Sequence, residues 1–258
     1  MHYDVISLRE FYASAFGQPV FAHVSDKIGE IWPATQKEED WRILAIGYGL
    51  PYLEKLWPDA DLYAFMLAQM GVFGWQMPHA SGNQTALIES GLLPLADNSI
   101  DRILLMHGLE HAGDIAGFLA ELRRVLVPGG KILAVTPNRL GWWSRSDHSP
   151  WGGGQPFNQS QLRRALHKAE LVPTFWSASL FCPPVFWRFG LKFFPRFFPY
   201  FEKAGESLFP RLCGLQIVEA TKLVYAPLDG YKNQQKHRRL KPKPVLAPQT
   251  QKVQRKKI

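Results

Sequence analysis

"IDRILLMHGLEHAGDIAGFLAELRRVLVPGGKILAVTP", Ile100–Pro137, predicts a strand, a helix and a second strand in succession. The apolar run at 103–106 is continuous rather than alternating, which is typical of a strand buried on both faces of a parallel sheet. "DIAGFLAELRRVL" predicts an amphipathic helix, and Pro128-Gly129-Gly130 is a signal for its end. "KILAVTPN" follows as the next strand. One helical face carries the apolar side chains of Phe118, Leu119, Leu122, Val125 and Leu126.

On either side of this unit, strands alternate with helices from residue 41 to residue 170, which predicts a doubly wound, mostly parallel α/β sheet. The earlier strands are "WRILAIG", "DLYAFML" and "QTALIES". Two later strands, "TFWSASLF" and "LQIVEATKLVYAP", lack a clear helical crossover, so we expect an antiparallel hairpin at the C-terminal edge. Helix starts are indicated by capping-box spacings at Asn158/Gln161 and at Ser7/Glu10.

These patterns divide the chain into three parts: an N-terminal helical cap at 1–40, an α/β domain at 41–230 and a basic tail at 231–258. The domain carries an aromatic-rich insertion at about 182–214. The tail holds ten Lys/Arg and no Asp/Glu. The rest of the chain contains 20 basic and 22 acidic residues, so the net charge of +8 comes from the tail. We expect a disordered tail whose partner is an anionic membrane surface or non-specifically bound nucleic acid. A solvated tail without a partner is the alternative.

A candidate ligand-binding turn lies in "RILAIGYGLPYLEKL", Arg42–Leu56, where a strand passes through Gly47, Tyr48 and Gly49 into a helix. Ligands of open α/β sheets bind outside the carboxyl ends of the strands, which is where this turn lies. Two spaced glycines also serve a tight strand-to-helix turn without any ligand, so the pattern leaves both roles open.

The motifs from Leu93 to Asn138 resemble those of class I S-adenosylmethionine-dependent methyltransferases, in particular the type 11 group. In that family a pattern close to LPxxDxSxD precedes the fourth strand, and L-x-P-G-G closes the following helix; here they read "LPLADNSID" and "LVPGG". The resemblance spans roughly 41–172. It implies a class I methyltransferase-like Rossmann sandwich, S-adenosylmethionine as cofactor and transfer of a methyl group to an unknown acceptor.

The resemblance also implies positions for the cofactor contacts, and this chain departs from the family at several of them. The family's acidic residue before the first glycine is Ala45 here, and its third glycine is Pro51. The position of the ribose-binding acid falls at about Met66, whose thioether is a weak acceptor for a diol. The position of the acid that receives the adenine amino group falls on Glu89, for which a solvated loop acid is the alternative. The resemblance therefore assigns Gly47, Tyr48, Gly49, Glu89 and His107 to a degenerate cofactor site.

The segment "MHGLEHAGD" places His107, Glu110 and His111 directly after the fourth strand, near the carboxyl ends of the sheet. His107 and His111 are candidate general bases, because imidazole exchanges protons near neutral pH. A structural role for both histidines is the alternative. Cys182 and Cys213 have no metal-ligand spacing, so we expect no metal site.

Two aromatic segments remain. The loop at 138–157 contains Trp142, Trp143 and Trp151 and is interpreted either as a substrate lid or as a cover that packs its aromatic side chains. In the segment at 183–210, basic residues recur every four positions among aromatic ones, which is typical of a helix at a membrane surface. An insertion that packs onto the domain is the alternative. The basic residues are Arg188, Lys192 and Arg196.

Two functional hypotheses follow from the sequence. The first is a methyltransferase with an atypical first loop, and the second is a catalytically inactive relative that acts as a binding or membrane-surface module. The N-terminus lacks a basic region followed by an apolar run, so no signal peptide is expected. Two cysteines suit reduced thiols, with one disulfide as the alternative. We therefore expect a cytoplasmic protein, with peripheral membrane association as an extension of that location.

Overall fold

A computed structural model describes residues 4–33, 41–72, 74, 85–147, 149–187 and 198–223. Residues 1–224 form one compact unit. The basic tail at 231–258 and the residues that carry the predicted basic stripe, 188–197, lie outside the described residues. The predicted division into cap, domain and tail therefore stays a prediction.

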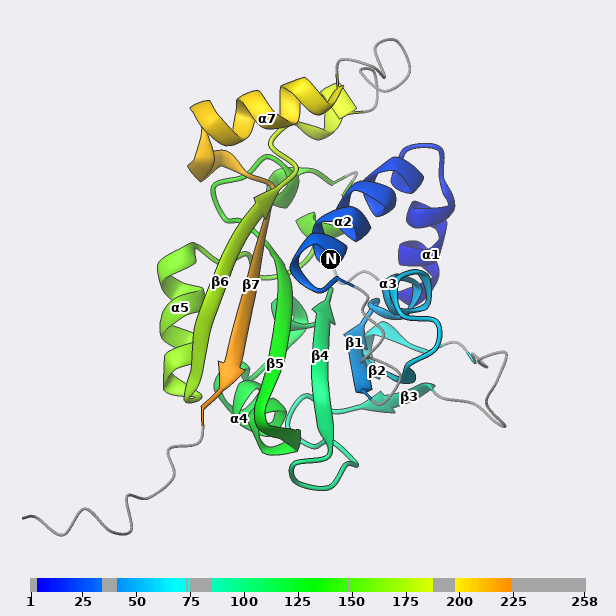
Figure 1. The fold of residues 1–258 in the computed structure, drawn as a ribbon. Helices are drawn as coiled ribbons and strands as arrows, with labels where there is room; N and C mark the ends of the chain where they lie inside the picture. Colours follow the sequence, from blue (N-terminus) through cyan, green and yellow to red (C-terminus); the bar gives the residue numbers. More distant parts are fainter. Residues whose placement is uncertain are drawn as a thin grey trace, which may run out of the picture. The chain divides into compact units, whose positions relative to one another are not determined.

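The core of the unit is a seven-stranded sheet with the order β3-β2-β1-β4-β5-β7-β6 (Figure 1). Neighbouring strands from β3 to β5 are parallel, and β7 is antiparallel to both β5 and β6. The doubly wound sheet and its antiparallel C-terminal edge are confirmed, with β7 lying between β5 and β6. The strands are β1 Arg42–Gly47, β2 Asp61–Leu67, β3 Thr85–Ile88, β4 Ile100–Met106, β5 Leu126–Pro137, β6 Leu171–Ser179 and β7 Leu215–Lys222.

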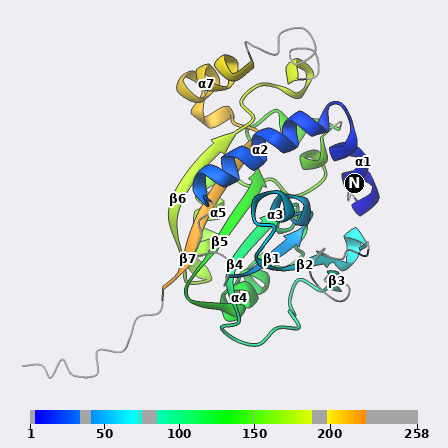
Figure 2. The same cartoon turned by 45° about the vertical axis from the view of Figure 1, so that its right-hand side comes forward.

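Helices cover both faces of the sheet (Figures 1 and 2): α1, α2 and α3 lie on one side, and α4 and α5 lie on the other. Helix α7 lies beyond the edge where the parallel strands end. The α-helices are α1 Val5–Ala13, α2 Gly17–Ile31, α3 Leu50–Leu56, α4 Ile115–Val125, α5 Gln159–Lys168 and α7 Phe198–Leu208. Short 3₁₀ turns are η2 Ala68–Met70, η3 Leu109–His111, η4 Trp143–Arg145, η5 Pro150–Gly152 and η6 Pro210–Leu212.

Two local predictions need correction. The first helix is capped by Asp4, whose carboxylate accepts a hydrogen bond of 2.8 Å from the Ser7 amide, so Ser7 lies inside the helix. Helix α4 ends at Val125, and Pro128-Gly129-Gly130 lies within β5, beside a register shift in its pairing with β4. The capping box at the start of α5 is confirmed.

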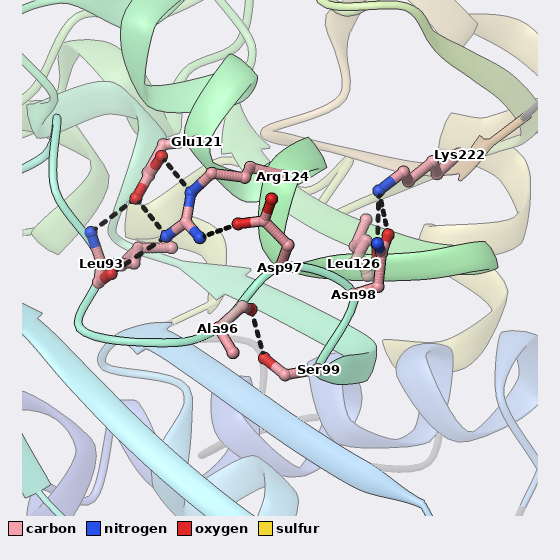
Figure 3. Close-up of polar contacts among 9 residues, drawn as sticks. All are labelled: Leu93, Ala96, Asp97, Asn98, Ser99, Glu121, Arg124, Leu126 and Lys222. Carbon is pink, nitrogen blue, oxygen red and sulfur yellow. Dashed lines mark hydrogen bonds and ion pairs between the residues drawn. The ribbon is translucent and has the colours of Figure 1, made fainter.

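The motif that precedes β4 serves the scaffold (Figure 3). Arg124 of α4 forms ion pairs with Asp97 of the loop and with Glu121, and it donates a hydrogen bond to the Leu93 carbonyl oxygen. The hydrogen bond from Arg124 holds the pKa of Glu121 below its ordinary value. The amide oxygen of Asn98 accepts a hydrogen bond of 2.8 Å from Lys222 of β7. These contacts tie the loop to α4 and to the last strand.

A buried carboxylate attaches the N-terminal helices to the sheet. Glu219 of β7 is 6% exposed. It accepts hydrogen bonds of 2.7 Å from the Trp32 indole at the end of α2, 2.7 Å from Thr174 and 3.0 Å from Lys131. Burial alone would raise the pKa of Glu219, but these three donors outweigh it and hold the pKa below its ordinary value. Glu219 thus adds a charged contact to the buried apolar side chains of α2, Val20, Val24 and Ile28.

Candidate functional site

The crevice of the sheet lies between β1 and β4, where the strand order reverses. Gly47 ends β1 beside Met106, the last residue of β4. The Tyr48 amide donates a hydrogen bond of 2.7 Å to the Met106 carbonyl oxygen, and His107 follows immediately. The structure therefore brings together Gly47, Tyr48, Gly49 and His107, at the position where ligands of open α/β sheets bind.

The glycine of this turn is required by the neighbouring strand. Gly47 has φ +77°, and a Cβ on it would lie 2.1 Å from the Met106 carbonyl oxygen. His107 also leaves its strand with a positive φ of 55°, a conformation that histidine, asparagine and aspartate adopt more often than other residues with a side chain. A Cβ on Gly49 would lie 3.1 Å from the Ala45 side chain. Tight packing of β1 against β4 therefore explains Gly47 without any ligand.

An aromatic residue of α1 fills the space over the turn. The ring of Tyr12 stacks on the ring of Tyr48, with centroids 5.3 Å apart and planes within 5°. Its hydroxyl and His107 Nε2 are joined by a hydrogen bond of 2.7 Å. Burial raises the pKa of Tyr12 well above its ordinary value, so the hydroxyl is neutral. Tyr12 was not among the sequence candidates.

The loop at 138–157 closes the crevice from the other side. The indole of Trp151 is fully buried and packs against His107, with ring centroids 5.0 Å apart. Trp143 is also buried; it stacks on Phe16 and donates a hydrogen bond of 2.9 Å to the Cys182 carbonyl oxygen. Two of the three tryptophans thus pack inward, as the interpretation of this loop as a cover predicts, and they cover strand ends.

A buried imidazole and a buried carboxyl lie side by side behind Tyr12. His107 Nδ1 is 3.6 Å from Glu110 Oε1, and both side chains are fully buried. Neither oxygen of Glu110 accepts a hydrogen bond from a described residue. Tyr12, His107 and Glu110 therefore form a row of hydroxyl, imidazole and carboxyl groups, in which Tyr12 and His107 share a hydrogen bond and His107 and Glu110 do not. Leaving a buried carboxyl without donors costs free energy, so this row is unusual for a purely structural core.

The remaining candidates lie around the crevice. His111 is buried in η3, and its carbonyl oxygen accepts a hydrogen bond of 2.7 Å from Gln69, which follows β2. Glu89 follows β3, two strands away from β1, and is exposed. Met66 is buried within β2. The structure does not join Glu89 to the glycine turn by any contact among the described residues, and its role at the adenine stays a prediction.

A separate groove of about 870 Å³ lies between α5, β6, β7 and the α7–η6 region. None of the sequence candidates lines it. Its walls include Asn138, Phe175, Trp176, Phe181, Arg211 and Gln216.

Residues 66–134 match the type 11 family model described as a methyltransferase domain. Over this segment the chain is similar to S-adenosylmethionine-dependent methyltransferases. The match begins inside β2 and ends inside β5, so it leaves out the turn at Gly47–Gly49. The similarity in sequence thus rests on the scaffold of this methyltransferase fold.

Two relatives also match this chain over a part of its length. A protein of Mycolicibacterium smegmatis described as an S-adenosylmethionine-dependent methyltransferase is 42% identical over 80 residues, which is 31% of this chain and 28% of the relative. The ubiquinone/menaquinone biosynthesis C-methyltransferase UbiE of Rubrivivax gelatinosus is 42% identical over 53 residues, 20% of this chain and 21% of the relative. The chain therefore matches about a quarter of the length of these relatives.

Solved structures share the fold over most of the chain. Geranyl diphosphate C-methyltransferase of Streptomyces coelicolor, a complex with S-adenosyl-L-homocysteine, has a TM-score of 0.54 at 12% identity and covers 78% of this chain and 80% of that one. The [4+2]-cyclase SpnF has a TM-score of 0.52 at 16% identity, covering 83% and 84%. These two structures are named for different reactions, so the likeness to them shows a shared fold and not a shared reaction.

The described residues do not fit the cofactor in this conformation. The ring of Tyr12 covers Tyr48 above the glycine turn, and Trp151 covers His107, so side chains of the chain itself occupy the crevice. Ala45 and Met66 are buried apolar residues at positions where the family has carboxylates. Binding of a nucleoside cofactor between β1 and β4 would require the aromatic side chains to move.

Proposed function

We propose that this chain is an S-adenosylmethionine-dependent methyltransferase with a degenerate first loop and an unassigned methyl acceptor. The observation that carries the proposal is the combination of the strand order with the methyltransferase-domain match at 66–134. The names of the curated relatives support the same cofactor. The polar groups of the crevice, His107 and Glu110, are the candidates for holding or moving a proton.

Calorimetric titration of the purified full-length protein with S-adenosylmethionine tests this proposal. We expect saturable binding with a dissociation constant below about 1 mM, because enzymes commonly bind metabolites with KM values between about 1 μM and 1 mM. Glu89→Ala should weaken binding, because this exposed carboxylate is the remaining candidate for the adenine amino group. An absence of heat at millimolar ligand would contradict the proposal and favour the second function, a catalytically inactive binding module. That second function is supported by the aromatic side chains that fill the crevice.

We also propose that the protein associates peripherally with anionic membranes through α7 and the segment before it. Tyr200, Leu208 and Phe209 leave 71%, 69% and 58% of their surfaces exposed, and Val185 and Phe186 are also exposed. Exposed aromatic and aliphatic side chains beside basic residues suit a lipid headgroup region. Residues 183–214 contain five Lys/Arg against two Asp/Glu.

Helix α7 is held to the domain through Glu202, while its Tyr200 and Leu208 are exposed. Glu202 is buried and accepts hydrogen bonds of 3.1 Å and 2.9 Å from the amides of Phe181 and Cys182. It also accepts one of 3.3 Å from the Trp187 indole. Among the described residues, no helix is long and apolar enough to cross the bilayer. Surface attachment is therefore the form of membrane contact that this helix supports.

Sedimentation with vesicles containing anionic lipid tests the membrane proposal. We expect the double variant L208D/F209D to lower the bound fraction at least fivefold, because two exposed anchors become anionic. The matched control is Leu92→Asp, an equally exposed leucine before β4, which should bind like the wild type. Equal binding of both variants would contradict the proposal and point to the basic tail, whose partner stays a prediction.

The free thiols of Cys182 and Cys213 support a cytoplasmic location.

A further inference from the structure

We propose that the groove beside the end of β6 is a binding site for a neutral saccharide. Its volume of about 870 Å³ lies in the range of small-molecule sites, about 300–1,000 Å³. The groove is formed by the start of α5, the ends of β6 and β7, and the α7–η6 region. The described residues that line it are not those of the crevice between β1 and β4. The inference therefore goes beyond the proposed function and does not depend on S-adenosylmethionine.

The buried side of the groove contains an acceptor without a donor. Gln216 of β7 is 5% exposed and lines the groove. Its amide nitrogen donates hydrogen bonds of 2.7 Å to the Phe157 carbonyl oxygen and 3.3 Å to Asn138 Oδ1. These bonds fix the orientation of the amide, and its Oε1 has no donor among the described residues. Because a buried polar atom is rarely left unpaired, this oxygen indicates a ligand that brings an O–H or N–H group.

The rim of the groove offers donors and acceptors together. Arg211 of η6 and Glu206 of α7 are exposed and line it, so their opposite charges favour neither an anion nor a cation. Gln159 and Ser160 lie in the first turn of α5, where helix N–H groups have no intrahelical acceptor. Hydroxyl groups both donate and accept, so a neutral ligand with several hydroxyls matches this mixture. An anion would be repelled by Glu206 and by Gln216 Oε1.

Aromatic side chains form the apolar part of the groove. Phe175 is 48% exposed, and Trp176 beside it is half-buried. The guanidinium of Arg163 in α5 lies 5.6 Å from the centroid of the Trp176 ring, a contact that helps to fix the indole. The C–H groups on the face of a sugar ring can pack on such rings, while the hydroxyls at its edge reach polar atoms. The rings thus favour a cyclic sugar over an open-chain polyol.

Saturation-transfer NMR of the full-length protein with maltose, cellobiose and N,N′-diacetylchitobiose tests the proposal. Each sugar is supplied at about 10 mM, which would nearly fill a site with a dissociation constant of about 1 mM. We expect transfer to the ring C–H protons of at least one sugar, and the signal should persist when S-adenosylmethionine is added. No transfer to any of these sugars, displacement by S-adenosylmethionine, or tighter binding of glucose 6-phosphate would overturn the proposal.

Two variants assign the binding to the groove. Phe175→Ala removes an exposed ring, and Gln216→Met removes the unpaired oxygen while it keeps the length of the side chain. Each should weaken binding of the sugar by about fivefold or more, as expected for one ring contact or one hydrogen bond. The matched control is Leu87→Ala in β3, at the opposite edge of the sheet, where the side chain is 49% exposed.

The control should bind the sugar like the wild type. Wild-type affinity in either folded groove variant, or an equal loss in Leu87→Ala, would overturn the groove as the site. Circular dichroism verifies that each variant folds. Phe175→Ala keeps the comparison valid if Gln216→Met does not fold, because the Phe175 side chain is half exposed.

Discussion

Glu219→Gln tests how the N-terminal helices are attached to the sheet. The substitution keeps the shape of the side chain, but it removes the charge and replaces one acceptor oxygen by a donor. The glutamate accepts three short hydrogen bonds, from Trp32, Thr174 and Lys131. Glutamine must turn an amide N–H toward one of these donors, so at least one contact is lost.

The magnitude follows from the number and type of these bonds. Hydrogen bonds to charged groups contribute about 1.5–3 kcal/mol each, against about 0.5–1.5 kcal/mol for neutral pairs. Loss of the charge on three bonds, with one of them broken, should lower the free energy of unfolding by about 3 kcal/mol. For a unit of this size, that corresponds to a fall in the melting temperature of about 6–12 °C.

The effect should depend on pH in one direction. The pKa of Glu219 is lowered in the folded state, so its contribution is fully present above the unfolded pKa of about 4.3. It is lost as the pH falls through the lower folded value. The wild type and Glu219→Gln should therefore differ at pH 7 and converge in strong acid.

Thermal unfolding followed by circular dichroism at pH 7 and at low pH measures both effects. Glu170→Gln is the matched control, because Glu170 forms an exposed ion pair with Arg123. Such pairs contribute about 0–1 kcal/mol, so this variant should melt close to the wild type. The reasoning would be refuted if Glu219→Gln melted within 2 °C of the wild type at pH 7, using the same conversion of about 2–4 °C per kcal/mol.

Two further substitutions test the crevice. Gly47→Ala should destabilise the fold by about 2 kcal/mol or more in urea unfolding, because the φ of Gly47 is positive and a Cβ would strike the Met106 carbonyl oxygen. The control is Gly91→Ala, which has open space around it and should change stability by less than about 1 kcal/mol. Equal effects of the two substitutions would contradict the packing argument. Trp151→Ala should cost about 3–5 kcal/mol, because the indole is fully buried. In the same loop, half-exposed Trp142→Ala should cost about 1 kcal/mol or less, and the reverse order would show that the loop does not close the crevice.

The sheet was predictable from the sequence because its signals are local. The continuous apolar run before His107 and the alternation of strands with helices both report burial between helical layers. The antiparallel C-terminal edge was expected because the sequence between the last two strands shows no clear helical crossover; the structure does place α7 there, and β7 still runs antiparallel to β6. Choosing between neighbouring capping residues was less secure: Asp4 and Ser7 are both good N-cap residues, and the structure uses Asp4.

The filling of the crevice was not predictable in the same way. Tyr12 and His107 are 95 positions apart, and no local pattern states which crevice an N-terminal helix enters. The spacing of Val5, Leu8 and Tyr12 marks one buried face of α1, which identifies Tyr12 as an inward residue but does not name its partner. Trp151 was visible as one tryptophan of a long loop, and only the fold shows that it packs on His107.

We propose that the crevice between β1 and β4 is the cofactor site. Ultraviolet cross-linking of the full-length protein with radiolabelled S-adenosylmethionine, followed by peptide mapping, tests it most directly. We predict label in the peptides that contain Tyr48 or His107, and competition by unlabelled cofactor. Competed label found instead in peptides that line the groove at Phe175 and Trp176, with none at Tyr48 or His107, would contradict the claim.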